Sequence, residues 1–150
     1  MIIQRNEIKK LLPHRRPFLF LDSCNILEIG IKGVGYRKFS PDEYFFEGHF
    51  PNLPIVPGVI LIEALAQTAG VVVSKGFEHT SDKSVLFMSI SNAKFRKPVL
   101  PNDEISFEVE KINNVKSVYK FQGVAKNKIT KVCESEFSAM IIDKASSEIL

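Results

Sequence analysis

The stretch that decides the fold is Pro57–Ser74, PGVILIEALAQTAGVVVS, which carries one charged residue in eighteen. Proline suits the first position of a helix, because its missing N–H has no helical acceptor there. Gly76 marks the expected end. A helix that is apolar on nearly every side has to be covered by the rest of its domain. The sequence therefore predicts one long buried helix from Pro57 or Gly58 to about Gly76.

Residues 55–74 are also long enough to cross a membrane, since they number twenty with a single charge. Against this, Glu63 would place a carboxylate near the middle of the bilayer, at a cost of about 3 kcal/mol. Pro57, Gly58 and Gln67 weaken a membrane helix further. We therefore expect a helix buried inside its own domain and no membrane span.

After the helix the apolar pattern changes to a period of two, which is typical of strands. The clearest case is Ile105, Phe107 and Val109, with Ser106 and Glu108 between them. Further strands are predicted within 24–40, 85–90, 117–126 and 129–142, with a short helix over 5–12 and an ordered proline-rich loop over 41–57. The expected turns are Asn113–Asn114 and Lys126–Asn127.

These elements indicate an α+β fold in which about five or six antiparallel strands curve around one helix. We expect a single domain over residues 1–150, since no linker or repeat interrupts the chain. A composition of 45% apolar and 25% charged residues is that of a soluble globular protein. The net charge of +3 is spread along the chain, so nucleic acid is not an expected ligand.

The cysteines and the N-terminus indicate a compartment. Cys24 and Cys133 lie far apart and form no CxxC motif, so both are expected to be reduced. Residues 1–18 contain too many charges and too short an apolar run for a signal peptide. We therefore expect a cytoplasmic protein.

Glu63 is the most unusual residue of the helix. A carboxylate among Ile60, Leu61 and Ile62 is costly to leave ionised, so we expect it to hold a proton near neutral pH, as a general acid must. Gln67 lies four residues further on, on the same helical face, and can orient the carboxyl group. The structural alternative is a glutamate paired with a lysine or arginine at an interface.

His49 lies in the proline-rich loop, within Phe45–Pro51, FFEGHFP. A histidine can accept a proton near neutral pH, and loops held rigidly by packing often carry function. Most loop histidines are exposed and have no such role, so spacing alone makes His49 a weaker candidate than Glu63.

The turn into the helix supplies a third candidate group. The first backbone N–H groups of a helix, here those of Gly58 and Val59, have no helical acceptor and lie at the positive end of its dipole. Glycine also lets a ligand approach the backbone closely. These N–H groups could stabilise a carbonyl oxygen that becomes an enolate. Ordinary helix initiation explains the same residues equally well.

A base, an acid and an oxyanion donor together suit removal of a proton next to a carbonyl, followed by loss of a β-hydroxyl group. No nucleophile elbow, phosphate loop or dinucleotide motif is present. The three histidines, His14, His49 and His79, do not have the spacing of a zinc motif.

Three ordered segments resemble the bacterial (3R)-hydroxyacyl-acyl-carrier-protein dehydratases of the FabZ type, which belong to the hot-dog superfamily. Leu11–Phe18, LLPHRRPF, is similar to the LLPHRYPFL opening of that family. Gly48–Pro51 and Pro57–Gln67 are similar to its GHFPxxPxxPGVxxxEALAQ signature, and Ala93–Val99, AKFRKPV, to a later segment.

Two short segments depart from the family pattern. Asn52–Leu53 stands where many members have glycine and a variable residue, and Pro101–Asn102–Asp103 replaces a PGD turn. Asparagine tolerates a positive φ better than most residues, so we expect the turn at Asn102 to survive.

The resemblance implies a hot-dog fold and a dehydratase of fatty acid synthesis that needs no cofactor or metal. It implies His49 as the catalytic base, Glu63 as the acid and Gly58 as the contact for the thioester carbonyl. It also implies homodimers that assemble into a hexamer, with each active site shared between His49 of one chain and Glu63 of another. The expected partner is an acidic acyl carrier protein, for which Lys94, Arg96 and Lys97 are a candidate docking patch.

Two related enzymes stay open as alternatives. An isomerising FabA-like dehydratase carries aspartate where this chain has Glu63, so the glutamate favours the non-isomerising type. A hot-dog thioesterase would activate water with a carboxylate and would depend less on His49. A non-catalytic acyl-binding protein is a third possibility, which the His49 and Glu63 pair disfavours. The acyl chain length, and whether the product serves lipid A or ordinary fatty acids, are not encoded in these motifs.

Overall fold

A computed structural model describes residues 1–77 and 83–143 of the 150-residue chain. Its elements, in chain order, are β1 (Ile2–Gln4), α1 (Arg5–Leu11), β2 (Ser23–Glu28), β3 (Lys32–Lys38), the 3-10 helix η1 (Tyr44–Glu47), α2 (Gly58–Ser74), the 3-10 helix η2 (Lys75–Phe77), β4 (Lys83–Phe95), β5 (Glu104–Val115), β6 (Val118–Asn127) and β7 (Thr130–Asp143).

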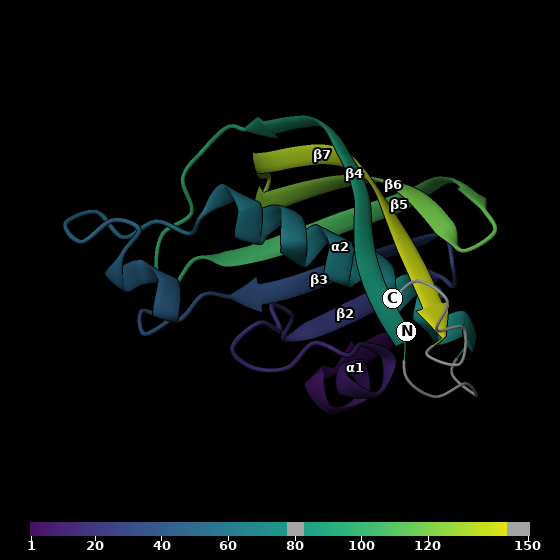
Figure 1. Ribbon diagram of the computed structural model, residues 1–150. Helices are drawn as coiled ribbons and strands as arrows, with labels where there is room; N and C mark the ends of the chain where they lie inside the picture. The colour runs from purple at the N-terminus through teal and green to yellow at the C-terminus, as the bar shows by residue number, and fades with distance from the viewer. Residues whose placement is uncertain (78–82, 144–150) are drawn as a thin grey trace.

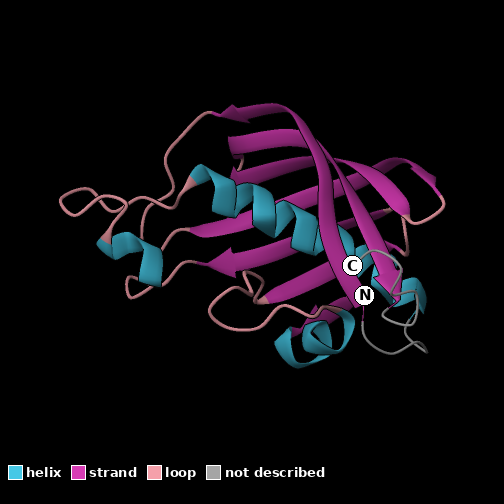
Figure 2. Cartoon of the chain, viewed as in Figure 1, coloured by secondary structure: helices cyan, strands magenta, loops and turns pink. Residues whose placement is uncertain are grey.

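The described strands form one antiparallel sheet in the order β1-β2-β3-β5-β6-β7-β4. The sheet curves around α2, which runs across its concave face (Figure 1). Figure 2 shows the same arrangement, with the long helix enclosed by strands and the short α1 at one end. The predicted hot-dog architecture is confirmed. Our strand count was too low, because the three-residue β1 is too short to show an alternating pattern.

The central helix is buried by the sheet, as its composition predicts. Every residue from Ile60 to Ser74 is buried except Glu63. The 20-residue segment Gly58–Phe77 is long and apolar enough to cross a membrane, yet 78% of its most apolar window is buried inside the protein. Strand β3 approaches the helix closely at Gly33, where a Cβ atom would lie 2.5 Å from Cγ2 of Val72. A larger side chain there would push the sheet away from the helix.

Both predicted turn positions in the C-terminal half were wrong by a few residues. Asn113 and Asn114 lie inside β5, and the chain reverses at Lys116, which has a φ of 54°. The second reversal falls at Lys128, with a φ of 58°, after Asn127 has ended β6. Two lysines therefore adopt the left-handed conformation that propensity assigns to asparagine or glycine.

Three other local expectations have clear outcomes. The turn at Asn102 survives, with a φ of 72° and a hydrogen bond of 2.6 Å from its N–H to the carbonyl oxygen of Phe39. The α-helix ends at Ser74, two residues before the expected stop at Gly76, and the chain continues through Gly76 as the 3-10 helix η2. The predicted helix over 5–12 is observed as α1, and its inner face buries Ile8 and Leu11.

Both cysteines are buried and unbridged, as predicted. Burial raises the pKa of the Cys24 thiol to about 12 and that of Cys133 to about 11. At neutral pH both are therefore thiols, the less reactive form.

Candidate active site

His49 is held firmly at the start of the loop that joins η1 to α2. Its backbone N–H donates to the carbonyl oxygen of Phe45 at 3.0 Å, and its own carbonyl accepts from the N–H of Ile55 at 2.9 Å. The imidazole stacks on the ring of Phe50, with centroids 4.3 Å apart. Backbone hydrogen bonds and aromatic packing thus fix the ring without regular secondary structure around it.

The hydrogen bonding of the His49 ring shows which of its two nitrogens carries the proton. Nδ1 lies 3.1 Å from the carbonyl oxygen of Ile55. A carbonyl oxygen can only accept, so Nδ1 is the nitrogen that carries the proton in the neutral ring. Nε2 is then the unprotonated nitrogen, with a lone pair that can accept a proton.

His49 lines a cavity of about 410 Å³ at the start of α2. Gly58, Val59 and Leu61 line it from the helix, and Phe95, Arg96 and Lys97 line it from the end of β4 and the segment after it. In the described part of the chain, no carbonyl of another element accepts from the N–H of Gly58 or Val59. The structure therefore brings His49 together with both predicted oxyanion residues.

The ring of Phe95 packs so closely on Gly58 that any side chain at this position would have to displace it. A Cβ atom at position 58 would lie 2.5 Å from Cδ1 and Cε1 of Phe95. This requirement comes from packing across the mouth of the cavity. Helix initiation, the structural alternative, would not by itself need a glycine.

Gly58→Ala is expected to displace the Phe95 ring and to lower the free energy of unfolding by about 1 kcal/mol. The expected cost is at the low end for an overpacked site because, within one protomer, this ring is 55% exposed and can shift. Denaturant unfolding of Gly58→Ala measures it, in the wild-type background and in Phe95→Leu. We expect the cost to fall below about 0.5 kcal/mol in the Phe95→Leu background. An equal cost in both backgrounds would contradict the proposed contact.

Glu63 lies on another face of the same helix, and its carboxyl group is held at one oxygen. Oε2 accepts from Nε2 of Gln67 at 2.9 Å and lies 3.3 Å from Nε2 of His14. Gln67 is fully buried, and its amide also donates to the carbonyl oxygen of Phe18 and accepts from the N–H of Phe20, both at 2.8 Å. Among the described residues of one chain, Glu63 is therefore not paired with a lysine or arginine.

Within one chain, Glu63 does not line the cavity that contains His49. Gly58 and Glu63 are five residues apart, which turns their side chains about 140° from each other around the helix. The side chain of Glu63 is 17% exposed, so it still reaches the surface. The structure of a single protomer thus separates the predicted base from the predicted acid.

His14 is the site residue that the sequence reasoning missed. In the sequence, His14 was noted only within the LLPHRRPF segment and among the three histidines whose spacing does not fit a zinc motif. Nothing in the spacing of His14 and Glu63 predicts their contact, because it depends on how the segment before β2 folds back onto α2. His79, from the same rejected pattern, lies outside the described residues. Among the residues that the structure describes, no group of three or more His, Cys, Asp or Glu side chains could hold a metal ion.

The predicted docking residues lie at the exposed end of β4. Arg96 donates to Oε2 of Glu134 at 3.0 Å, and this hydrogen bond raises the pKa of the arginine. Lys94 lies opposite Glu134 in the β4–β7 register. Lys97 has no carboxylate partner among the described residues and lines the His49 cavity.

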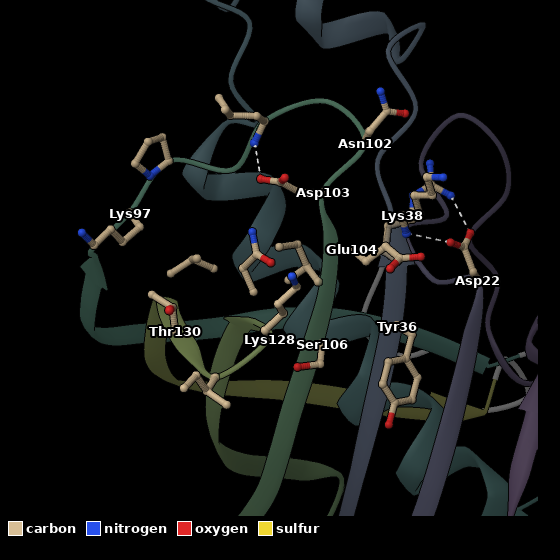
Figure 3. Close-up of a pocket in the computed structure, with 17 residues that line it drawn as sticks. Asp22, Tyr36, Lys38, Lys97, Asn102, Asp103, Glu104, Ser106, Lys128 and Thr130 are labelled. Carbon is tan, nitrogen blue, oxygen red and sulfur yellow. Dashed lines mark hydrogen bonds and ion pairs between the residues drawn. The ribbon is translucent and has the colours of Figure 1, made fainter.

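Lys97 also lines a wider cleft of about 1160 Å³. Figure 3 shows Lys97 on one side of this cleft, Lys38 and Asp22 on the other, and Lys128 between them. The cleft contains neither His49 nor Glu63, so its size does not make it the reaction site.

Comparison with known proteins identifies relatives along most of the chain. The family model described as the FabA-like domain matches residues 12–136. A 3-hydroxyacyl-[acyl-carrier-protein] dehydratase FabZ from Caulobacter vibrioides is 45% identical over 138 residues, which cover 91% of this chain and 87% of that protein. A FabZ dehydratase from Rhodospirillum rubrum is 43% identical over 135 residues, which cover 89% and 84%.

A solved structure supports the fold independently. The dehydratase heterocomplex ApeI:P from Xenorhabdus doucetiae superposes with a TM-score of 0.74 at 15% identity, covering 92% of each chain. At that identity the likeness concerns the fold alone.

Proposed function

This chain is a member of the FabA-like family and groups with its FabZ dehydratases, and we propose that it converts 3-hydroxyacyl thioesters on acyl carrier protein into trans-2-enoyl thioesters. The reaction would belong to fatty acid synthesis in the cytoplasm. The observation that carries the proposal is the geometry of His49. Its Nδ1 is engaged by the Ile55 carbonyl, which leaves Nε2 as the proton acceptor, and the residue lines a cavity together with Gly58 and Val59 at the start of α2.

The base and the oxyanion donor act on the same end of the substrate. Nε2 of His49 removes a proton from C2, and the electron pair of that C–H bond moves toward the thioester carbonyl. The N–H of Gly58 donates to the carbonyl oxygen as negative charge develops there, with that of Val59 beside it. The positive end of the α2 dipole lies at the same place and favours the same charge.

The acid completes the elimination. The electron pair returns to form the C2–C3 double bond as the C3–O bond breaks, and Glu63 donates its proton to the departing hydroxyl group, which leaves as water. His49 then holds the proton from C2, and Glu63 is ionised. The starting state is restored when His49 loses this proton and Glu63 gains one.

A second protomer is needed to bring Glu63 to the His49 cavity. β4 supplies the surface for it, because this 13-residue strand is the last in the sheet and one of its edges has no partner strand in the described chain. It exposes five large apolar side chains, those of Leu86, Phe87, Met88, Ile90 and Phe95. A long apolar edge of this kind associates with another strand unless it is covered.

We place the twofold axis of a homodimer beside β4, so that the β4 strands of two protomers meet. His49 of one chain and Glu63 of the other would then share a cavity. A hexamer built from three such dimers, which the family resemblance implies, is a prediction for light scattering on the purified protein.

The carrier protein would dock where its prosthetic arm can enter the His49 cavity. Lys97 has the position for this contact, since it lines both that cavity and the neighbouring cleft. Lys94 and Arg96 extend the positive patch, although Glu134 already neutralises part of it. An acidic carrier is attracted to such a surface.

Lys97→Glu is expected to raise KM for a carrier-bound substrate about 10-fold, since like charges would now face each other. KM for the same acyl group on pantetheine should not change. Lys10→Glu is the matched control, because it makes the same charge change on the exposed face of α1. An equal rise in KM from both variants, or a rise for pantetheine as well, would argue against docking at Lys97.

The proposed reaction is tested with purified protein and 3-hydroxyacyl carriers of graded length. Dehydration appears as enoyl-thioester absorbance, and a trans-2 product without the cis-3 isomer separates this activity from an isomerising dehydratase. Release of free thiol in place of enoyl product would instead indicate a thioesterase, and binding without turnover a non-catalytic protein.

A further inference from the structure

We propose that His14 is a positioning residue that places the acidic proton of Glu63 on the oxygen facing the substrate. This inference rests on the proposed function, and it assigns a role to a residue outside the base, acid and oxyanion set. It starts from one contact, the 3.3 Å approach of Nε2 of His14 to Oε2 of Glu63.

The two polar groups recorded near the Glu63 carboxyl group both lie beside the same oxygen, Oε2. Nε2 of Gln67 donates to Oε2 at 2.9 Å, and Nε2 of His14 faces Oε2 from another element. Among the described residues, no hydrogen bond or ion pair is recorded at Oε1. The two oxygens of one carboxyl group therefore have different surroundings.

The tautomer of His14 follows from its other nitrogen. Nδ1 is buried and has no hydrogen-bond partner in the described structure. A proton on Nδ1 would leave a buried donor unsatisfied, whereas a proton on Nε2 would lie on the side of the ring that faces Oε2 of Glu63, 3.3 Å away. The neutral ring is therefore expected to carry its proton on Nε2 and to donate to Oε2.

The segment that carries His14 is fixed by its neighbour. The guanidinium of Arg15 donates to the carbonyl oxygens of Leu12, His14 and Lys9, at 2.9, 2.7 and 2.9 Å. The side chain of His14 is only 14% exposed, so the ring has little freedom to turn away from Glu63. The contact is thus built by the fold of residues outside the central helix.

This arrangement decides which oxygen of Glu63 carries the proton. A protonated carboxyl group has one carbonyl oxygen, which accepts well, and one hydroxyl oxygen, which donates. Two donors at Oε2 favour that oxygen as the carbonyl, so the proton is held on Oε1. Oε1 is then the atom that delivers the proton to the leaving hydroxyl group of the substrate.

The test compares two variants of the whole enzyme. His14→Leu removes the donor, and His14→Gln restores one, because the glutamine amide can reach the place of Nε2. We expect His14→Leu to lower kcat about 10- to 100-fold, as for other losses of alignment, with KM changed less than about twofold. His14→Gln should recover most of kcat, to within about threefold of the wild type.

Stability separates positioning from a structural role. His14→Leu removes the buried nitrogen that lacks a partner, so its unfolding midpoint in urea should equal or exceed that of the wild type while kcat falls. A lowered midpoint together with a lowered kcat in both variants would overturn the proposal, as would wild-type turnover in His14→Leu. Absence of dehydration in the wild-type enzyme, measured alongside, would instead refute the proposed function.

The tautomer is tested without turnover. Nitrogen-15 NMR of the histidine rings, with His14→Gln used to assign the resonance, should show His14 protonated at Nε2. A His14 ring protonated at Nδ1 would overturn the proposal whatever the activity of the variants.

Discussion

Replacement of Glu63 by glutamine is expected to lower kcat for dehydration about 10³-fold and to leave the fold unchanged. The loss is large because an amide cannot supply the proton that the departing hydroxyl group needs, and a positioned general acid contributes about 10²- to 10⁴-fold. The fold should tolerate the change, since the carbonyl oxygen of the new amide can still accept from Gln67 and can still face His14. Stopped-flow or steady-state measurement of enoyl product gives kcat.

Glu28→Gln is the matched control, because it removes an exposed carboxylate at the end of β2. Its turnover should equal that of the wild type. The free energy of unfolding of Glu63→Gln should stay within about 1 kcal/mol of the wild-type value, as expected for a change that keeps its hydrogen bonds. Turnover within a few-fold of the wild type in Glu63→Gln would remove Glu63 from the mechanism.

Replacement of His49 by asparagine is expected to lower kcat by a similar factor, about 10³-fold. The asparagine amide can keep a hydrogen bond to the carbonyl oxygen of Ile55, the partner of Nδ1 in the wild type. It has no basic nitrogen in the place of Nε2. The variant therefore tests the base while the loop keeps its anchor, and steady-state kinetics with carrier-bound substrate measures the loss.

His49→Ala removes both the base and the hydrogen bond that anchors the loop. Comparing it with His49→Asn therefore separates the two roles. If the base is what matters, asparagine and alanine at position 49 should be about equally inactive. Substantially greater turnover with asparagine than with alanine would show that His49 acts by ordering the loop. Thermal unfolding of both variants then measures what the anchor contributes to stability.

The sequence contains the information for the central helix and for the chemistry of its surroundings. Residues 57–74 are so apolar that only a sheet wrapped around them could bury them, and the period of two in the C-terminal half supplies the strands of that sheet. Glu63 was the one charged position in that stretch. It is also the only residue between Ile60 and Ser74 that is not buried.

The features that could not be predicted depend on tertiary contacts. Lys116 and Lys128 occupy left-handed turn positions because the pairing of β5, β6 and β7 determines where the chain reverses, and this overrides residue preference. The contact of His14 with Glu63 joins a loop to the central helix, and no periodic pattern in the sequence predicts it. The sequence left Gly58 open between an oxyanion contact and ordinary helix initiation, and the packing of the Phe95 ring on it became evident only in the structure.

Because His49 and Glu63 lie apart within one chain, the central claim is that each site is shared between two chains. Subunit complementation tests this claim most directly. Protomers carrying His49→Asn are mixed with protomers carrying Glu63→Gln under conditions that exchange subunits. If each site takes His49 from one chain and Glu63 from the other, every mixed dimer holds one intact site. Random mixing should then restore about a quarter of wild-type activity, from two variants that are each almost inactive. Activity that stays at the level of the separate variants after verified exchange would contradict a shared site.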